Sequence, residues 1–216
     1  MMTGLIITGG TMNYGFAGDF LKDKTYDKVI AVDGGLEAVE ALGLIPDVVV
    51  GDFDTVNLQL LARYRKRAGI AWDQHKPEKD ETDTELALNT AMELGCDSIT
   101  ILGATGGRMD HAIGNIHLLY ACLLKGVRAW IVDEKNRISI LNGRTQFYAD
   151  AVWGKYISFL PLTEWVRGIT LEGFKYPLFQ KDITIGTSLC ISNELVEETG
   201  VITFTDGALI CVESHD

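Results

Sequence analysis

The sequence predicts an α/β domain with a mostly parallel sheet flanked by helices, followed by an all-β domain built as an antiparallel sandwich or small barrel. Over residues 1–135, short β-branched and apolar runs alternate with segments of helical spacing, as in strands joined by crossover helices. Over residues 136–216, short β-rich runs follow one another, and turn dipeptides such as Asn142-Gly143 separate several of them. We therefore expect a domain boundary near residue 135.

The elements of the first part follow from this periodicity. Strands are expected at residues 5–8, 28–32, 48–50, 70–72, 98–102 and 128–132. Helices are expected at residues 36–42, 58–68, 82–94 and 112–125. The third helix begins with a capping box, in which the Thr82 hydroxyl caps the helix and the Glu85 side chain reaches back. In the second part, strands are expected at residues 137–141, 145–148, 156–160, 168–171, 187–192, 201–205 and 209–212.

Composition excludes several classes of protein. The net charge of −11 over 216 residues argues against a nucleic-acid partner, because phosphate backbones are bound by basic patches. No run approaches the ~18 apolar residues of a membrane helix, and the first residues do not resemble a signal peptide. The four cysteines form no C-x-x-C pair, which favours reduced, buried thiols. We therefore expect a cytoplasmic protein that binds neither nucleic acid nor membrane.

The segment from Val48 to Thr55 carries the clearest chemical signal. Three valines form a short buried strand, Gly51 ends it, and Asp52 and Asp54 follow at a spacing of two. Ligands of open α/β sheets bind beyond the carboxyl ends of the strands. Two carboxylates this close repel each other unless a cation lies between them or one is protonated. Because Mg²⁺ prefers such oxygen ligands, the segment predicts a metal and phosphate site.

Three further polar loops are expected at the same edge of the sheet. They carry Asp33-Gly34-Gly35, the acidic segment 79–83 and the glycine-rich segment 103–110. Asp83 lies in the first turn of a helix, where it either completes the metal shell, accepts a proton from an attacking hydroxyl, or only stabilises the helix end. Each loop alone has a structural explanation, so the prediction rests on their combination.

The glycine-rich segment predicts a phosphate-binding loop of an uncommon type. It matches neither the Walker A motif nor G-x-G-x-x-G. Backbone N–H groups around Thr105, Gly106 and Gly107 can approach a phosphate because glycine has no Cβ. Arg108 could then pair with phosphate oxygens, whereas the acidic Asp110 suits a ribose or base contact better. His111 and His117 are expected to serve packing or hydrogen bonding rather than catalysis.

Together these motifs resemble a known family. They are Asp33-Gly34-Gly35, Pro46-Asp47 with Gly51-Asp-Phe-Asp-Thr55, Lys79-Asp-Glu-Thr-Asp83 and Gly103-Ala-Thr-Gly-Gly-Arg-Met-Asp-His111. In this order and spacing the chain resembles bacterial thiamine pyrophosphokinases, and the resemblance extends over residues 168–178 and 186–194 of the second part. The main departure is Thr55, where many relatives carry serine, and both residues supply a hydroxyl.

The resemblance implies an enzyme that uses Mg²⁺ to transfer the pyrophosphoryl group of ATP to the hydroxyl of thiamine, giving thiamine diphosphate and AMP. It implies a nucleotide-binding catalytic domain, a domain for thiamine binding and dimerisation, and a homodimer. Carried over by position, the implied metal-binding and catalytic residues are Asp52, Asp54 and Asp83, with Asp83 as the candidate base. The implied nucleotide-binding residues are Lys79, Asp80, Thr105, Gly106, Gly107, Arg108 and Asp110. The implied thiamine-binding residues are Asp33, Gly34, Ser192 and Asn193.

Two other interpretations remain at this stage. Asp52-Phe-Asp-Thr-Val56 also satisfies the D-x-D-x-[T/V] pattern of haloacid-dehalogenase-type phosphatases, in which the first aspartate is a nucleophile. Against this reading, two strands are expected before the motif, which in that family usually ends the first strand. A non-enzymatic nucleotide or thiamine sensor would share the binding residues without needing a base.

Overall fold

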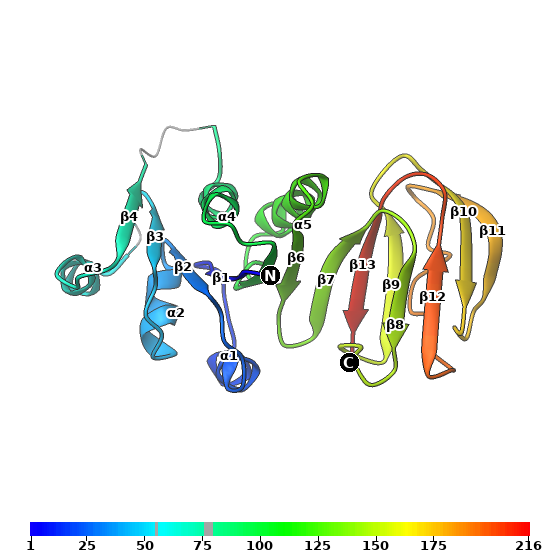
Figure 1. The fold of residues 1–216 in the computed structure, drawn as a ribbon, viewed down its shortest axis with the longest axis horizontal. Helices are drawn as coiled ribbons and strands as arrows, with labels where there is room; N and C mark the ends of the chain where they lie inside the picture. Colours follow the sequence, from blue (N-terminus) through cyan, green and yellow to red (C-terminus); the bar gives the residue numbers. More distant parts are fainter. Residues whose placement is uncertain (55, 76–79) are drawn as a thin grey trace. The chain divides into compact units, whose positions relative to one another are not determined.

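The computed structural model describes residues 1–54, 56–75 and 80–216. These residues divide into two compact units, Met1–Glu134 and Lys135–Asp216. Helices and strands alternate through the first unit, whereas the described residues of the second unit form strands and no helix (Figure 1). The structure therefore confirms the predicted fold class, an α/β unit followed by an antiparallel β unit.

The first unit contains a parallel sheet with the strand order β4-β3-β2-β1-β5-β6. Its strands are β1 (Thr3–Ile7), β2 (Lys28–Val32), β3 (Val48–Gly51), β4 (Ala71–Gln74), β5 (Ser98–Leu102) and β6 (Arg128–Val132). The chain adds β2 to β4 on one side of β1 and then returns to add β5 on the other side. This reversal puts a topological switch point between β1 and β5, where open α/β sheets bind their ligands.

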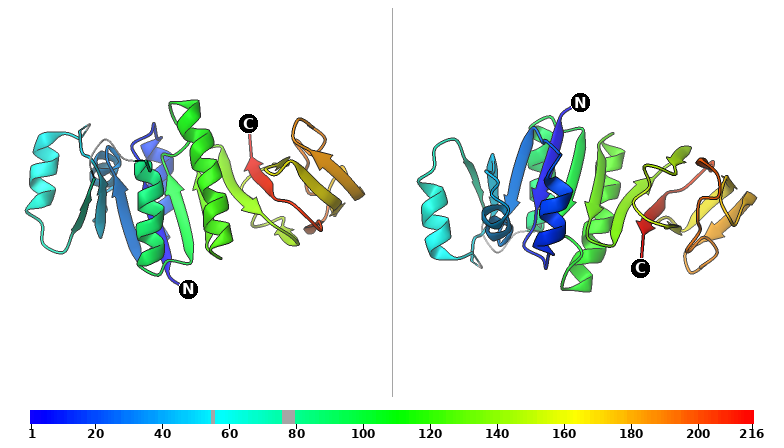
Figure 2. Two further views of the ribbon diagram at one scale, coloured as in Figure 1. Left: turned by 90° about the horizontal axis from the view of Figure 1, so that it is seen from above. Right: turned by 90° about the horizontal axis from the view of Figure 1, so that it is seen from below.

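Helices cover both faces of this sheet. They are α1 (Tyr14–Leu21), α2 (Gly35–Ala41), α3 (Leu58–Arg65), α4 (Asp83–Glu93) and α5 (Met109–Leu124). Helices α4 and α5 lie on one face and α1 and α2 on the other, as the two views of Figure 2 show. The enclosed strands are apolar, and Ile6, Ile30 and Ile101 are fully buried between the layers. Burial on both faces explains why these strands read as continuous apolar runs.

Three helices differ from the sequence-based prediction, and one of them, α3, ends at Arg65 rather than at residue 68. No element was expected at Tyr14–Leu21, where Gly15 and Gly18 lower the helix propensity. The helix forms because Asn13 caps it, accepting a hydrogen bond from the Phe16 N–H at 3.1 Å, and because Ala17 is buried. Helix α5 begins at Met109 rather than at residue 112, so the glycine-rich loop leads directly into its first turn.

The second unit is a sandwich of two antiparallel sheets, with strand orders β7-β13-β9 and β11-β10-β12-β8. Its strands are β7 (Asn136–Leu141), β8 (Thr145–Tyr148), β9 (Tyr156–Pro161), β10 (Trp165–Glu172), β11 (Leu178–Thr184), β12 (Thr199–Thr203) and β13 (Leu209–Ser214). Both sheets contribute to one buried core, in which the rings of Phe147, Phe159 and Phe174 meet edge to face. Such ring pairs add about 0.5–1.5 kcal/mol each beyond area burial.

One expected strand of this unit is wrong and one strand was missed. Residues 187–192 form turns rather than a strand, in keeping with the positive φ angles of Gly186 and Ser192. Strand β11 was not expected because most of its side chains are exposed, so it lacks the alternation of apolar and polar residues. It lies at a sheet edge, where such alternation is least required.

No helix within the described residues is long and apolar enough to span a membrane.

Candidate active site

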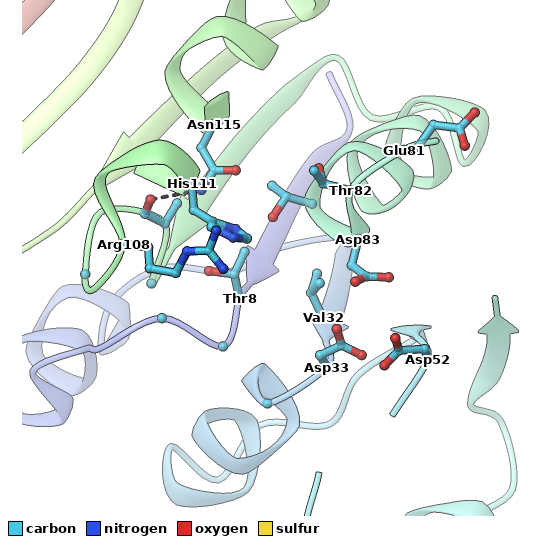
Figure 3. A pocket seen from close by; sticks show the side chains of 17 residues that line it. Thr8, Val32, Asp33, Asp52, Glu81, Thr82, Asp83, Arg108, His111 and Asn115 are labelled. Atoms are coloured by element: carbon cyan, nitrogen blue, oxygen red, sulfur yellow. Dashed lines mark hydrogen bonds between the residues drawn. The ribbon is translucent and has the colours of Figure 1, made fainter. Parts of the chain in front are cut away.

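A pocket of about 590 Å³ opens in the first unit at the carboxyl ends of β1, β2, β3 and β5 (Figure 3). All four polar loops expected from the sequence contribute residues to its lining, among them Asp33, Asp52, Asp83 and Gly106. A fifth segment, Thr8-Gly9-Gly10, lines the pocket after β1. The pocket therefore occupies the switch-point crevice between β1 and β5.

Glycines allow the loops of this crevice to pack closely. A Cβ atom added to Gly10 would overlap the carbonyl oxygen of Gly103, and one added to Gly106 would overlap that of Thr11. A Cβ added to Gly35, at the start of α2, would overlap the Ile7 carbonyl oxygen. The loops after β1, β2 and β5 thus contact one another through backbone atoms. Side chains larger than glycine at these positions would push the loops apart.

Three carboxylates gather on one side of the pocket. Asp33 follows β2, Asp52 follows β3 and Asp83 begins α4, and their side chains point toward one another (Figure 3). Burial of the Asp33 carboxyl, its hydrogen bond with Asp83 and the charges of Asp83 and Asp52 raise the pKa of Asp33 to about 7. The cluster repels itself, so a bound cation or a shared proton is needed to offset the charge.

Two residues at this cluster, Asp33 and Phe53, have strained backbone conformations. Asp33 and Phe53 both have positive φ angles, 45° and 65°, which non-glycine residues rarely adopt. The Phe53 N–H donates a hydrogen bond to Asp33 Oδ1 at 3.2 Å, and a Cβ atom added to Gly51 would overlap that same oxygen. The Phe53 ring is buried edge-on against Trp72, at 5.4 Å between centroids. Aromatic packing therefore stabilises a turn that the backbone alone disfavours.

The glycine-rich loop is fixed by two side-chain hydrogen bonds. The Thr105 hydroxyl donates to Asp133 Oδ2 at 2.7 Å, and Asn115 Nδ2 donates to the Ala104 carbonyl at 2.9 Å. The loop then enters α5, with Arg108 at the N-cap position. The N-terminus of a helix attracts anions through its free N–H groups and its dipole.

Arg108 does not stand free at this helix end. Its guanidinium forms two hydrogen bonds to the Asp110 carboxylate, one of them from Nε to Oδ1 at 3.1 Å. This ion pair lowers the pKa of Asp110 to about 2 and raises that of Arg108. Both side chains are exposed, so a phosphate can compete with Asp110 for the guanidinium at little cost.

The site residues predicted in the first unit divide between the large pocket, smaller cavities beside it and the exposed surface. Asp33, Gly34, Asp52, Asp83, Gly106 and Arg108 line the large pocket. Thr105 and Asp110 line smaller neighbouring cavities, while Asp54, Asp80 and Gly107 are exposed and lie outside the large pocket's lining. Lys79 and Thr55 lie outside the described residues. Among the residues that are described, no three acidic, histidine or cysteine side chains form a ready metal cluster, so the metal ligands stay a prediction.

The sequence analysis missed several residues that line the pocket. Thr8 was expected to end the first strand, and Gly9 and Gly10 after it were given no role, although two glycines after a first parallel strand are typical of a ligand loop. His111 was expected to serve packing or hydrogen bonding rather than catalysis; it is exposed and lines the pocket beside Arg108 (Figure 3). Asn115 gave no signal in sequence, because its role depends on the contact with Ala104.

The capping box at α4 forms only in part. The Thr82 hydroxyl accepts a hydrogen bond from the Glu85 N–H at 3.2 Å, as expected. The Glu85 carboxylate, however, makes no hydrogen bond within the part of the chain that the structure describes. It lines a cavity between α4 and α5 instead.

In the second unit, Ser192 and Asn193 differ in accessibility. Ser192 is exposed with a φ angle of 57°, and its N–H donates to the Ser158 hydroxyl at 2.9 Å. The Asn193 side chain is buried, and its amide exchanges two hydrogen bonds with the Tyr176 backbone. Asn193 therefore holds the loop together, and Ser192 is the member of the pair that a ligand can reach.

Comparison with known proteins identifies the family. Residues 22–131 match the family model of the thiamin pyrophosphokinase catalytic domain, and residues 144–209 match that of its vitamin B1 binding domain. The thiamine pyrophosphokinase of Bacillus subtilis is 41% identical over 187 residues, which are 87% of each chain. The chain belongs to the thiamine pyrophosphokinase family. It is accordingly an enzyme, a pyrophosphotransferase.

Solved structures of this family share the fold. The crystal structure of the Bacillus subtilis thiamine pyrophosphokinase superposes with a TM-score of 0.88 at 37% identity and covers 99% of both chains. The crystal structure of the thiamin pyrophosphokinase from Geobacillus thermodenitrificans superposes with a TM-score of 0.86 at 33% identity. The match covers 100% of this chain and 98% of the Geobacillus chain. Membership of the family makes the phosphatase and sensor interpretations unnecessary.

Proposed function

We propose that this enzyme transfers the pyrophosphoryl group of ATP to the hydroxyl of thiamine, giving thiamine diphosphate and AMP. One observation carries the proposal beyond family membership. A carboxylate cluster and a glycine-rich loop that opens a helix line the same pocket, with Arg108 and His111 across from the acids (Figure 3). Pyrophosphoryl transfer needs such positioning and charge neutralisation rather than a covalent intermediate.

The acidic side suits a divalent cation. Asp52, Asp54 and Asp83 are our candidate ligands, since carboxylate oxygens are what Mg²⁺ prefers. Burial is the main cause that raises the pKa of Asp33, and the neighbouring charges of Asp83 and Asp52 add to it; a cation bound here would offset those charges. When bound, Mg²⁺ would neutralise phosphate charge and orient the reacting groups.

Asp83 is our candidate for the base. It begins α4 beside Asp33 and faces the pocket, so it could accept the proton of the thiamine hydroxyl as the new bond to phosphorus forms. Asp33 and Gly34 line the same side and are candidates for contact with thiamine.

The opposite side suits the nucleotide. Backbone N–H groups of Gly106 and Gly107 and the start of α5 would receive the phosphates, with Arg108 exchanging its Asp110 partner for a phosphate oxygen. Lys79, Asp80, Thr105 and Asp110 complete the proposed nucleotide set. Thr105 would act by positioning the glycine-rich loop, because its hydroxyl donates a hydrogen bond to Asp133.

The second unit is proposed to bind thiamine and to form the homodimer. Support comes from the match of residues 144–209 to a vitamin B1 binding domain. Ser192 is the proposed contact, and Asn193 supports its loop. We propose that the dimer works in the cytoplasm, where ATP and thiamine are available together.

Product analysis tests this proposal directly. The protein is incubated with thiamine, ATP and Mg²⁺, and the nucleotides and thiamine esters are separated. AMP formed in equal amount to thiamine diphosphate is the expected result. ADP or free phosphate with unmodified thiamine would refute it and return attention to phosphatase chemistry at Asp52.

A further inference from the structure

A smaller cavity of about 310 Å³ lies between α4 and α5 and continues from the large pocket. The two share Thr82, His111 and Asn115, so they form one connected space. Thr82, the N-cap residue of α4, lies across this space from His111 and Asn115 of α5 (Figure 3). None of the residue roles proposed so far accounts for the far part of this cavity, which is lined by Glu85, Gly114 and Leu118.

Gly114 has no structural reason to be glycine. It is exposed in the interior of α5, and a Cβ atom added there would meet no atom within 4 Å. Glycine in a helix interior costs about 0.5–1 kcal/mol relative to alanine. The other described glycines with equally open surroundings either have positive φ angles or lie in a turn: Gly43, Gly69, Gly107, Gly126, Gly186 and Gly143. Gly114 thus leaves open a space that the folded chain itself does not fill.

The polar atoms around this space are mainly hydrogen-bond acceptors. Asn115 is only 8% exposed, and its Nδ2 is used by the Ala104 carbonyl. Its Oδ1 has no partner among the described residues, and neither has the Glu85 carboxylate. Both acceptors open onto the cavity, so a ligand with hydrogen-bond donors can reach them. The cavity is completed by the apolar Leu118 and the planar ring of His111.

We propose that this cavity, with Gly114 as its floor, binds the purine base of the nucleoside triphosphate donor and selects a base with an exocyclic amino group. The proposal rests on the function proposed above, in which a nucleotide supplies the pyrophosphoryl group. The base lies flat against the α5 backbone at Gly114, where a side chain would exclude it. Its amino group donates to Asn115 Oδ1 and Glu85.

The position of the cavity favours the nucleotide over thiamine. It adjoins the first turn of α5, which follows the phosphate-binding loop, and Asp110 of that turn lies on its rim. In a nucleotide the ribose lies between the phosphates and the base. With the phosphates at the start of α5 and the ribose near Asp110, the base would lie one or two helical turns further along α5, at this cavity. The candidate thiamine contacts Asp33 and Gly34 line only the large pocket.

Gly114→Val tests the proposal. Valine fills the floor, yet its helix propensity is no worse than that of glycine, so the variant should fold. With Mg²⁺ present, calorimetry should show ATP and AMP binding weakened at least about tenfold, as expected when side-chain atoms intrude on a fitted pocket. Binding of inorganic tripolyphosphate and the KM for thiamine should stay within about twofold. Ala121→Val, at an exposed position of the same helix outside both cavities, should leave all three unchanged.

The amino group is tested with the unmodified enzyme. ATP should bind at least about tenfold more tightly than purine riboside triphosphate, which lacks the 6-amino group and so cannot donate to Asn115 Oδ1 and Glu85. Unchanged ATP affinity in Gly114→Val would overturn the proposal, as would an equal loss of tripolyphosphate binding. A rise in the KM for thiamine alone would show that the cavity holds the other substrate. Because binding is measured directly, these outcomes stand apart from whether the wild-type enzyme forms AMP.

Discussion

Replacing Asp33 by asparagine should stabilise the metal-free protein at pH 8. Burial and the neighbouring Asp83 and Asp52 raise the pKa of Asp33 from 3.8 to about 7. Between about pH 4 and pH 7, the folded protein therefore keeps a proton that the unfolded chain has released. The stability due to this proton is fully present below pH 4 and is lost as the pH rises through 7.

The size of the effect follows from the shift. Each pKa unit corresponds to 1.36 kcal/mol, so a shift from 3.8 to about 7 sets an upper limit of about 4 kcal/mol. The carboxyl group is only partly buried, and solvent screening reduces the expected gain to about 1–3 kcal/mol. Asparagine keeps the geometry, because its Oδ1 can still accept from the Phe53 N–H and its Nδ2 can donate to Asp83.

Urea unfolding in the presence of EDTA, at pH 8 and at pH 5, measures the stability of Asp33→Asn relative to the wild type. The stability advantage of Asp33→Asn over the wild type should be largest at pH 8 and shrink at pH 5, where the wild-type carboxyl is protonated. Asp54→Asn, an exposed change in the neighbouring loop, should alter stability by less than about 0.5 kcal/mol. An asparagine variant that is less stable than the wild type at pH 8, or an advantage that does not depend on pH, would refute the reasoning.

Three further predictions concern activity and packing. Asp83→Asn should lower turnover about 10²- to 10⁴-fold while nucleotide binding persists, and full turnover would exclude Asp83 as the base. Gly51→Ala should lower the free energy of unfolding, measured with urea, by more than about 2 kcal/mol and should abolish turnover. The added Cβ overlaps Asp33 Oδ1, and the φ angle of Gly51 is 146°. A variant with normal stability and activity would contradict this prediction. In the second unit, Arg137→Met should lower the free energy of unfolding by about 3–5 kcal/mol, because it leaves the buried Glu213 carboxylate without its ion pair. A loss of stability below about 1 kcal/mol in urea unfolding would show that the ion pair is dispensable.

Much of the site could be foreseen because parallel strands end at a common edge. The loops at Asp33, Asp52, Asp83 and Gly106 were each recognised from local sequence, and all four line one pocket. What could not be foreseen depends on neighbours across the sheet. Helix α1 formed against its low propensity because Ala17 is buried in tertiary packing. Residues 187–192 form turns, in keeping with the positive φ angles of Gly186 and Ser192.

The sequence by itself determined the alternation of strands and helices in the first part, the two-part organisation and the family resemblance, because these depend on periodicity and on motifs read along the chain. Only the tertiary structure decided which side chains meet. It brought Asp33 and Asp83 into one hydrogen bond, paired Arg108 with Asp110, and left the backbone of Gly114 open to a cavity. The physical reason is that sheet order and packing set these distances, and neither is encoded in the spacing of residues along one segment.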